Sequence, residues 1–290
     1  MIKHLYFFYD FLMIVFALLQ KIILFRFSSA SSFPSKKNKK TVILTNGPSL
    51  KKDIKKIISK KNESEFYVVN FFGVTKEFRI IKPEFYVVAD AAYWRDDINK
   101  DLKKKMKDLY KSLSKVDWEM CILCPSEAVE PILKKIKKNK YIKVKPIKSC
   151  VYHFKTEKMN IFSLCNGITT PIFINVLVLS LWHTLQRKIK KIEIYGADFS
   201  GFKGYSVNQF NNHLYMSTPH FYKKSRAETY TSSKYVGGTK KKIHMRFYQL
   251  WTAFYQMYLL SLVAKKFKIK VINCSSNSYL DSFDRSKNLS

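Results

Sequence analysis

The sequence predicts an α/β fold with a doubly wound, mostly parallel sheet, preceded by an apolar helix. Three observations lead to this prediction. Short β-branched or aromatic runs alternate with longer charged segments from Thr41 onward. The short runs are apolar on both faces, as expected of strands that helices cover on both sides. An apolar stretch at Leu5–Phe25 precedes the first of these runs.

The composition excludes several classes of protein. With 47% hydrophobic and 16% aromatic residues, the 290-residue chain has enough apolar material for a packed core. The net charge of +32 comes from 46 Lys and only seven Arg. Proteins that read nucleic acid rely on Arg, so we expect no nucleic-acid partner, and instead an anionic membrane surface or sugar nucleotide. Five Cys, an odd number, indicate a reducing compartment.

Residues 1–27 are predicted to form a membrane helix. The 21 residues of Leu5–Phe25 include 14 Leu, Ile, Val or Phe and would span about 31 Å as a helix. Asp10 and Lys21 oppose insertion, so a spanning helix and an interfacial helix both remain open. More Lys and Arg follow the stretch than precede it, which predicts that the following domain lies on the cytoplasmic side.

A polar linker at residues 28–40 and one domain at residues 41–290 are expected to follow. Runs rich in β-branched and aromatic residues predict strands at Thr41–Thr45, Glu65–Asn70, Phe85–Asp90, Trp118–Cys124, Tyr141–Val144, Ile192–Gly196 and Lys268–Cys274. The longer segments predict helices at Ser49–Ser59, Asp97–Ser112, Ser126–Lys137, Thr170–Gln186 and Ile243–Phe267. Residues 200–242 lack clear periodicity and are predicted to form a lid.

Candidate site residues follow the predicted strands, because sheets of this kind bind ligands at the carboxyl ends of their strands. Asn46, Gly47 and Ser49 follow the first strand in a turn that leads into a helix. The N-terminus of such a helix directs N–H groups at its ligand and favours a phosphate. Asn70 and Asp90 end the second and third strands, where they would line the cleft or cap the next turn.

Other candidates lie farther along the chain. Thr169 or Thr170 is expected to cap a helix that begins at Pro171, as a second phosphate-binding helix start. His244 opens the last long helix, where an imidazole would accept a proton near pH 7. Cys121 and Cys124 have the spacing of half a zinc site, but they fall inside a predicted strand and are expected to be core residues.

Taken in order, these motifs resemble one known family. Asn46–Leu50 reads NGPSL, an Asn ends the second strand, I-T-T precedes a predicted helix, IYGADF ends the sixth strand, and a His opens the last helix. This series is similar to the bacterial CMP-sialic-acid-dependent sialyltransferases of glycosyltransferase family 42. The resemblance implies a single Rossmann-like domain with a lid, of the modified GT-A type, that works without a metal.

The resemblance also implies roles for individual residues. Asn46, Gly47 and Ser49 would hold the nucleotide and its phosphate, and Asn70 would contact the nucleotide or the donor. His244 would be the general base, with His213 or His220 as alternatives. The remaining donor-binding positions would be Asp90, Thr169, Thr170, Ser200 and Tyr205. Asp90 stands where the family has Asn, and Ser200 where it has Tyr.

The implied function is the inverting transfer of sialic acid, or a related acidic sugar, from a CMP-sugar to a cell-surface glycan or lipid-linked acceptor such as lipooligosaccharide. The enzyme would be anchored to the bacterial inner membrane with its catalytic domain in the cytoplasm, and a homo-oligomer remains open. A related-looking alternative is a Mg²⁺-dependent pyrophosphokinase of the pterin pyrophosphokinase and motility-accessory type, which has a similar GPSL turn. A membrane- or polysaccharide-binding protein with a degenerate site is a third reading.

Overall fold

The structure is a computed structural model that describes residues 2–25, 40–217, 220–221, 228–229 and 242–286. The predicted linker, apart from Lys40, and much of the predicted lid lie outside these residues. The statements below concern the described residues alone.

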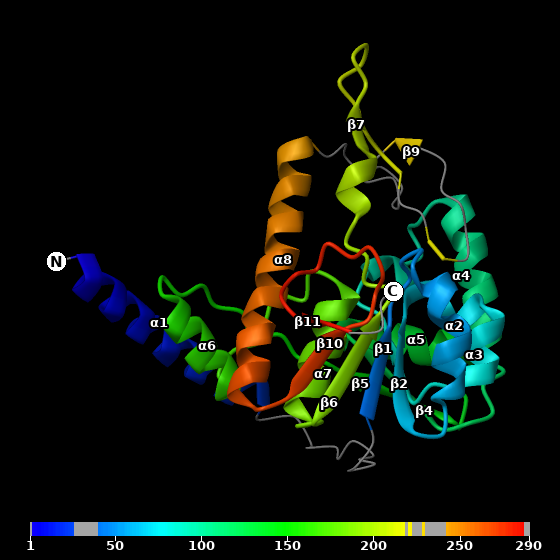
Figure 1. Cartoon of the computed structure of the whole chain (residues 1–290), viewed down its shortest axis with the longest axis horizontal. Helices are drawn as coiled ribbons and strands as arrows, with labels where there is room; N and C mark the ends of the chain where they lie inside the picture. The colour runs from blue at the N-terminus through cyan, green and yellow to red at the C-terminus, as the bar shows by residue number, and fades with distance from the viewer. Residues whose placement is uncertain (1, 26–39, 218–219, 222–227, 230–241, 287–290) are drawn as a thin grey trace.

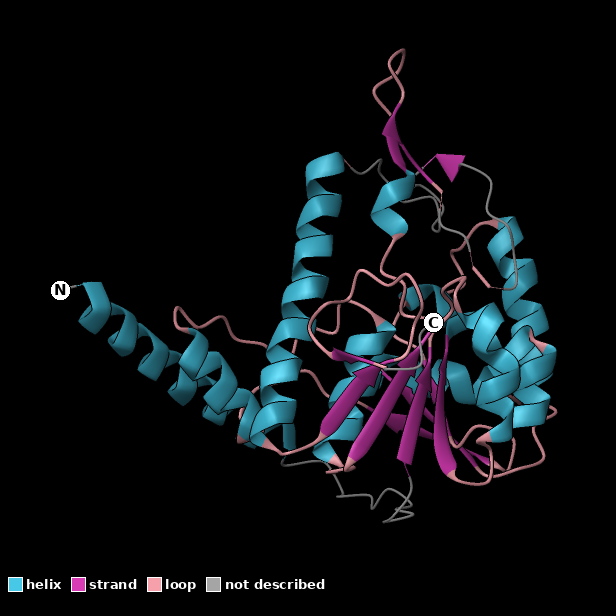
Figure 2. Ribbon diagram, viewed as in Figure 1, coloured by secondary structure: helices cyan, strands magenta, loops and turns pink. Residues whose placement is uncertain are grey.

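One parallel sheet forms the centre of the molecule, with helices on both faces (Figures 1 and 2). Among the described residues it has eight strands, in the order β11-β10-β6-β1-β2-β3-β4-β5, and every neighbouring pair is parallel. The strands are β1 (Lys40–Leu44), β2 (Ser64–Val69), β3 (Phe85–Val87), β4 (Met120–Cys124), β5 (Ile142–Pro146), β6 (Lys191–Tyr195), β10 (Lys270–Asn273) and β11 (Asp284–Arg285). The predicted fold class and all the predicted strands are therefore confirmed.

The helices occupy the segments between the strands. They are α1 (Ile2–Phe25), α2 (Leu50–Ser59), α3 (Lys76–Ile81), α4 (Lys100–Leu113), α5 (Val129–Lys135), α6 (Glu157–Cys165), α7 (Val176–Gln186) and α8 (Ile243–Lys266). Four short 3-10 helices follow strands or turns, at η1 (Asn70–Val74), η2 (Ala91–Tyr93), η3 (Ser126–Ala128) and η4 (Gly201–Gly204). The short α3 and α6 were not predicted, because six to nine residues carry too little periodicity to be recognised.

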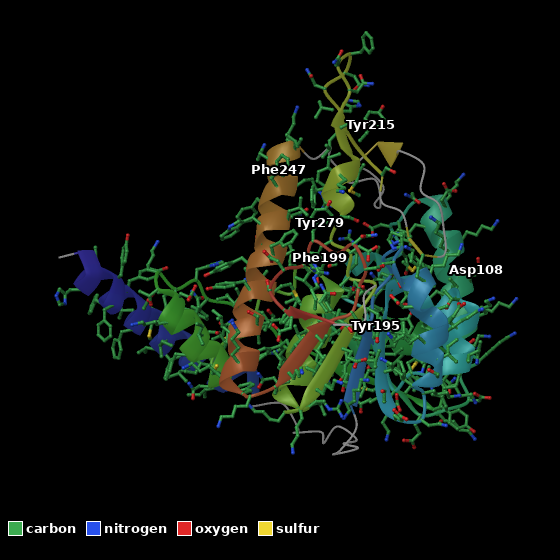
Figure 3. The ribbon with its side chains drawn as sticks, in the orientation of Figure 1. Asp108, Tyr195, Phe199, Tyr215, Phe247 and Tyr279 are labelled. Carbon is green, nitrogen blue, oxygen red and sulfur yellow. The ribbon has the colours of Figure 1, made fainter. Side chains whose placement is uncertain are left out.

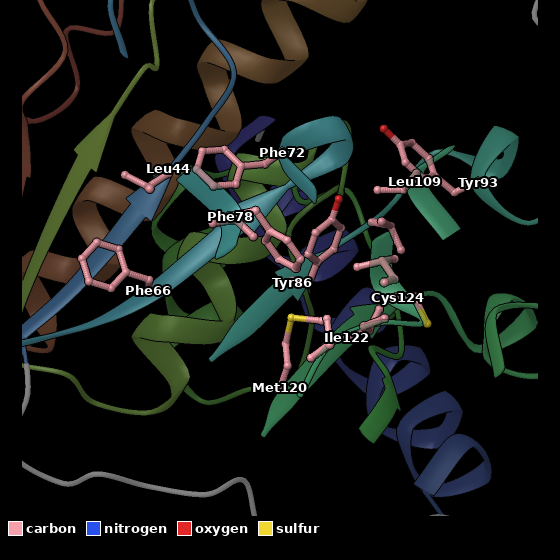
Figure 4. Close-up of a cluster of buried hydrophobic side chains, with 14 of the residues drawn as sticks. Leu44, Phe66, Phe72, Phe78, Tyr86, Tyr93, Leu109, Met120, Ile122 and Cys124 are labelled. Carbon is pink, nitrogen blue, oxygen red and sulfur yellow. The ribbon is translucent and has the colours of Figure 1, made fainter. Parts of the chain in front are cut away.

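The sheet is doubly wound because helices pack on both of its faces, and neighbouring residues of each strand point into the two different cores. Val42 and Leu44 pack into one core with α2, α3, α4 and α5, part of which is shown in Figure 4. Ile43 packs into a second core with α7 and α8. Cys121 and Cys124, three positions apart in β4, belong to different cores. They are core cysteines, as expected, and their side chains face away from each other.

The start of α7 differs from the prediction. The helix begins at Val176, and the side chain of Asn175 accepts a hydrogen bond from the N–H of Val178 at 2.9 Å. Thr170 cannot cap a helix because its N–H and hydroxyl oxygen are both hydrogen-bonded to the backbone of Cys150. The predicted helix start at Thr169 or Thr170 is therefore wrong.

The predicted lid contains regular structure. Three short strands, β7 (Tyr205–Val207), β8 (Leu214–Met216) and β9 (Glu228–Thr229), form an antiparallel sheet. This small sheet lies beyond the carboxyl edge of the main sheet, beside the first turns of α8 (Figure 1). Strands of two or three residues carry no detectable alternation, so the sequence did not reveal them.

Candidate functional site

The carboxyl ends of β1 and β6 form the topological switch point of the sheet. From β1 the chain continues through β2 to β5 in one direction, whereas β6 and β10 lie on the other side of β1. The loops that follow β1 and β6 lead to helices on opposite faces of the sheet, and in doubly wound sheets the crevice at such a point is the usual place for a ligand. The predicted residues Asn46, Gly47 and Ser49 lie at this point.

Two glycines allow the loops after β1 and β6 to touch. The N–H of Gly47 donates to the carbonyl of Gly196 at 2.9 Å. A Cβ on Gly47 would lie 2.2 Å from that same oxygen, and a Cβ on Gly196 would lie 2.6 Å from the carbonyl oxygen of Thr45. Gly196 also has φ +71°, a conformation that other residues rarely adopt. Larger side chains would force the two loops apart.

The carboxylate of Asp198 binds the N-terminus of α2. It accepts hydrogen bonds from the N–H of Ser49 at 2.9 Å and from the Ser49 hydroxyl. Burial raises the pKa of Asp198, although the two bonds from Ser49 act in the opposite direction. An anion of the chain itself thus occupies the position where the sequence predicted a phosphate, and the donors of Ser49 are already engaged.

Two asparagines place buried, unsatisfied oxygens beside the switch point. The side-chain N–H of Asn46 donates to the carbonyl of Val69 at 3.2 Å, which fixes the orientation of the amide and places it next to Asn70. The side-chain oxygens of Asn46 and Asn70 are buried, and neither has a hydrogen-bond partner among the described residues. Buried polar atoms without partners are uncommon in folded proteins. The two oxygens make this edge of the sheet a candidate site for a ligand with hydrogen-bond donors.

Asn70 is held in an unusual backbone conformation. Its φ is +52°, in the left-handed region that Asn tolerates better than most residues. The Tyr86 hydroxyl donates to the Asn70 carbonyl and also accepts from the N–H of Gly73 at 3.2 Å. Tyr86 is fully buried in the core, so the strand below the site holds the Asn70 backbone in place.

A short part of the predicted lid contacts the same site. The N–H of Phe221 donates to the carbonyl of Asn46 at 3.2 Å, and the ring of Phe221 lies 5.7 Å from that of Phe72. His220, the preceding residue, is exposed. One of the three candidate histidines therefore lies directly beside the Asn46 turn.

A second group lies higher, at the rim, and contains the predicted residues Tyr205 and His244 together with Arg246, which was not predicted. Arg246, in the first turn of α8, donates to the Tyr205 hydroxyl at 3.1 Å, and its guanidinium lies 5.6 Å from the Tyr205 ring centre. His244 is exposed and lies two residues before Arg246. In Figure 3 this end of α8, marked by Phe247, lies farther from the sheet than Phe199.

The length of α8 explains the height of this rim. Its 24 residues span about 36 Å, whereas a five-residue strand such as β6 spans about 17 Å. Since α8 packs along the sheet and ends just before β10, its first turns extend past the carboxyl edge. His244 therefore lies well above the crevice.

The other predicted site residues take structural hydrogen bonds. The carboxylate of Asp90 accepts from the N–H of Ala92 at 3.0 Å and so caps η2. The hydroxyl of buried Thr169 lies 2.8 Å from that of Ser163. Ser200 is half-buried and precedes η4. Thr170, described above, is bonded to Cys150 and is separate from the Asn46 group in its contacts.

His213 lies away from the crevice. It follows the turn between β7 and β8, where its carbonyl accepts from the N–H of Asn208 at 2.9 Å. Within the described residues, no three His, Cys, Asp or Glu side chains come together as metal ligands.

A cavity of about 600 Å³ lies at the carboxyl ends of β3, β4 and β5. Its walls include Ala89 after β3, Pro125 after β4, Ile147 after β5, and the non-helical segment Ile172–Ile174 before α7. The cavity is on the same edge of the sheet as Asn46 and Asn70, but neither residue lines it.

Some features of the site could be found in the sequence and others could not. The asparagines were found because polar residues directly after apolar strands are a local signal. Asp198 was visible as the polar end of the sixth strand, but its contact with Ser49 joins residues 149 positions apart. The contact of Phe221 with Asn46 has no sequence signal either, because it depends on how the lid folds back.

The fold defines a doubly wound α/β protein, and the oxygens of Asn46 and Asn70, unpartnered among the described residues, mark a candidate ligand site at its switch point. No family model matches the sequence, and no curated protein matches it. Among solved structures, the MAf glycosyltransferase from Magnetospirillum magneticum AMB-1 is similar, with 11% identity and a TM-score of 0.45 over 87% of this chain. The chain spans 34% of the length of that protein.

Proposed function

We propose that this chain is a glycosyltransferase that binds a nucleotide-activated sugar at the switch point between β1 and β6. The observation that carries the proposal is the pair of buried amide oxygens on Asn46 and Asn70, which lack partners in the described part of the chain. Both are acceptors, and they require donors from the ligand. A nucleoside supplies such donors through the hydroxyls of its ribose and the amino group of its base.

The nucleotide is proposed to be CMP, attached to sialic acid or a related acidic sugar. Cytosine carries an amino group, and the resemblance to the family 42 sialyltransferases supports this choice of donor. Because Asp198 engages Ser49, the phosphate is proposed to face the rim, where Tyr205 and Arg246 offer a hydroxyl and a guanidinium. A guanidinium would stabilise the charge that develops on the departing CMP.

The general base is proposed to be a histidine of the lid or rim. An acceptor hydroxyl must lose a proton as it attacks the sugar, and imidazole suits that task near neutral pH. The contact of Phe221 with Asn46 supports His220 over His244, because it holds the neighbouring residue beside the nucleotide site. His244, the residue that the resemblance implies, would have to reach down from the rim.

The acceptor is proposed to be a cell-surface glycan or a lipid-linked sugar, modified at the cytoplasmic face of a bacterial inner membrane. The 600 Å³ cavity beside the strand ends has the size of a small-ligand site and is proposed to hold the transferred sugar or the acceptor. Mg²⁺ is not required in this proposal, because the rim cation stabilises the leaving group.

Substitution of the asparagines tests the site. Asn70→Gly keeps the left-handed backbone and removes the buried oxygen, and Asn46→Ala removes the other. We expect each change to weaken CMP binding at least about tenfold, the equivalent of about 1.4 kcal/mol, as measured by calorimetry on the full-length protein. Asn99→Ala is the matched control, because Asn99 caps α4 and its loss should lower stability by about 1 kcal/mol without affecting CMP.

Ligand screening separates this function from the alternatives. Stabilisation by CMP without a metal supports the glycosyltransferase, and release of CMP from CMP-sugars then identifies the donor. A response to ATP with Mg²⁺ but not to CMP would instead favour the pyrophosphokinase, and the absence of any nucleotide effect would favour a binding protein.

Single histidine substitutions identify the base. We expect His220→Ala to retain CMP binding and to reduce turnover about 10²- to 10⁴-fold. His213→Ala serves as the control, because that residue lies in the β7–β8 connection. If His244→Ala has the large effect and His220→Ala has none, the assignment of the base to His220 is wrong.

A further inference from the structure

Two charged residues of the apolar helix α1, Asp10 and Lys21, contact the body of the protein. The carboxylate of Asp10 is fully buried and accepts from the N–H groups of Lys155 and Thr156 at 2.6 and 3.1 Å and from the Thr156 hydroxyl at 2.7 Å. Thr156 is the N-cap of α6. Eleven residues later, Lys21 donates to the carbonyl of Gly167 at 2.6 Å.

Asp10 and Lys21 lie on one face of α1, because eleven residues correspond almost to three full helical turns. Between them, fully buried Ala17 packs against Cys150 and Ile168. One face of α1 is therefore docked along the segment that contains α6. The docked face carries both of the charges that oppose insertion into a membrane.

The opposite face of α1 is apolar and uncovered in the described structure. Its exposed large side chains are those of Leu5, Phe7, Phe8, Phe11, Leu12, Val15, Phe16, Leu18, Leu19, Ile22 and Ile23. A continuous apolar face of this extent is unfavourable in water and indicates a binding partner. Residues His4–Ile23 are also long and apolar enough to cross a membrane by length and composition.

An aromatic ladder on α8 lies next to the docking point of α1. The rings of Tyr248, Trp251, Tyr255 and Tyr258 stack in succession along the helix, with centres 5.1 to 6.4 Å apart. Helix α8 packs against α6, and the Glu157 carboxylate, next to the N-cap that Asp10 binds, raises the pKa of Tyr258. Tyr and Trp are the residues that favour the headgroup region of a bilayer.

We propose that α1 lies in the plane of an anionic bilayer, with its docked face toward the protein and its apolar face in the acyl chains, while the α8 ladder contacts the headgroups. A spanning α1 would have to withdraw Asp10 from the donors at Lys155 and Thr156 and carry it into the hydrocarbon. A spanning α1 could not keep these hydrogen bonds, because the neighbouring charged residues Glu157 and Lys158 would then have to enter the hydrocarbon as well.

Charge complementarity favours lipid over a second copy of the chain. Lys155 and Lys158 are exposed beside the docked helix, and the whole chain carries a net charge of +32. An anionic headgroup region would attract this surface, whereas a second copy would repel it. This inference is independent of the proposed glycosyl transfer.

Brominated lipids test the ladder. Full-length protein is mixed with phosphatidylglycerol vesicles whose acyl chains carry bromine, which quenches nearby tryptophan fluorescence. We expect quenching that Trp251→Phe removes in large part. Trp118→Phe is the matched control and should leave the quenching unchanged, because Trp118 packs on Phe78 and donates to the Pro83 carbonyl. Quenching that survives in Trp251→Phe overturns the ladder contact.

Tryptophan depth distinguishes the orientations of α1. In the Trp251→Phe protein, Trp is placed singly at Phe8, Phe16 and Ile23, three exposed positions along the apolar face. Bromine at different acyl depths should report one common depth for the three positions if α1 lies in the plane. A deep Phe16→Trp between two shallow positions would mean that α1 spans the bilayer. A stable dimer whose new tryptophans are not quenched would mean that a second copy covers the face; either result overturns the proposal.

Discussion

A few buried charged residues hold segments of this fold together, and the overall net charge of the chain does not show which ones. Arg187 forms a bidentate ion pair with Glu65, and both side chains are nearly inaccessible to water. Arg187 also donates to the Tyr67 hydroxyl at 2.8 Å. The same hydroxyl lies 2.8 Å from Nδ1 of His183. Burial, together with Arg187, lowers the pKa of His183 to about 3. This histidine is therefore neutral and structural.

A second buried carboxylate gives a pH-dependent prediction. Burial alone would raise the pKa of Glu193, but hydrogen bonds from Lys40 and Lys60, each at 2.7 Å, outweigh it and bring the pKa down to about 2. Because the pKa of Glu193 is lower in the folded protein, its ionised carboxylate gives its full stabilisation at pH values above 4.5, the pKa of the unfolded state. That contribution is lost as the pH falls through the folded value.

We therefore expect Glu193→Gln to lower the free energy of unfolding by on the order of 3 kcal/mol at pH 7. Denaturant titrations between pH 2 and pH 7 should show the difference shrinking below pH 4.5. Asp117→Asn is the control, because the Asp117–Lys82 pair is exposed and should contribute about 0–1 kcal/mol. A difference that is the same at pH 2.5 and pH 7 would contradict the assignment.

At the scale of elements, the sequence predicts the sheet well and the connections poorly. Runs such as TVILT and EFYVVN are apolar on both faces, so strands buried between two helical layers are recognisable locally. The start of α7 could not be predicted, because the pairing of Thr170 with Cys150 joins segments 20 residues apart. That bond competes with helix formation and leaves the cap to Asn175.

Helix α4 offers a prediction about electrostatics within one element. Lys103, Lys107 and Lys111 follow one another at intervals of four and line a single cavity of about 750 Å³, so their charges repel. Lys107→Glu would convert two repulsive pairs into attractive ones, and we expect it to stabilise the protein by about 0.5–1 kcal/mol in low salt. Thermal unfolding measures the effect, and Lys107→Gln should give about half of it. A gain that persists in 1 M salt would argue against an electrostatic origin.

At the scale of the whole molecule, α1 is an accessory to the two main cores. Among the described side chains of α1, none belongs to either core; Ala17 packs instead in a small third cluster with Cys150 and Ile168. The sheet should therefore fold without it, whereas α6 would lose the carboxylate of Asp10 at its N-terminus.

We expect deletion of residues 1–27 to give a folded, soluble body in which residues 150–168 exchange their amide hydrogens faster. Hydrogen exchange followed by mass spectrometry measures this, and the strands β1 and β2 should remain protected. Asp10→Ala in the full-length chain should reproduce the faster exchange at the start of α6 alone. Global loss of protection on deletion would show that α1 belongs to the folding core.

The pairing of Ser49 with Asp198, 149 positions later in the chain, imposes an order on biosynthesis. Ribosomes add about 5–20 residues per second, so the first of these two partners waits roughly 7–30 s for the second. The amino-terminal helix has left the exit tunnel long before that interval ends. With α1 at a bilayer as proposed above, the nascent polypeptide would reach lipid before Asp198 is available to join the loops after β1 and β6.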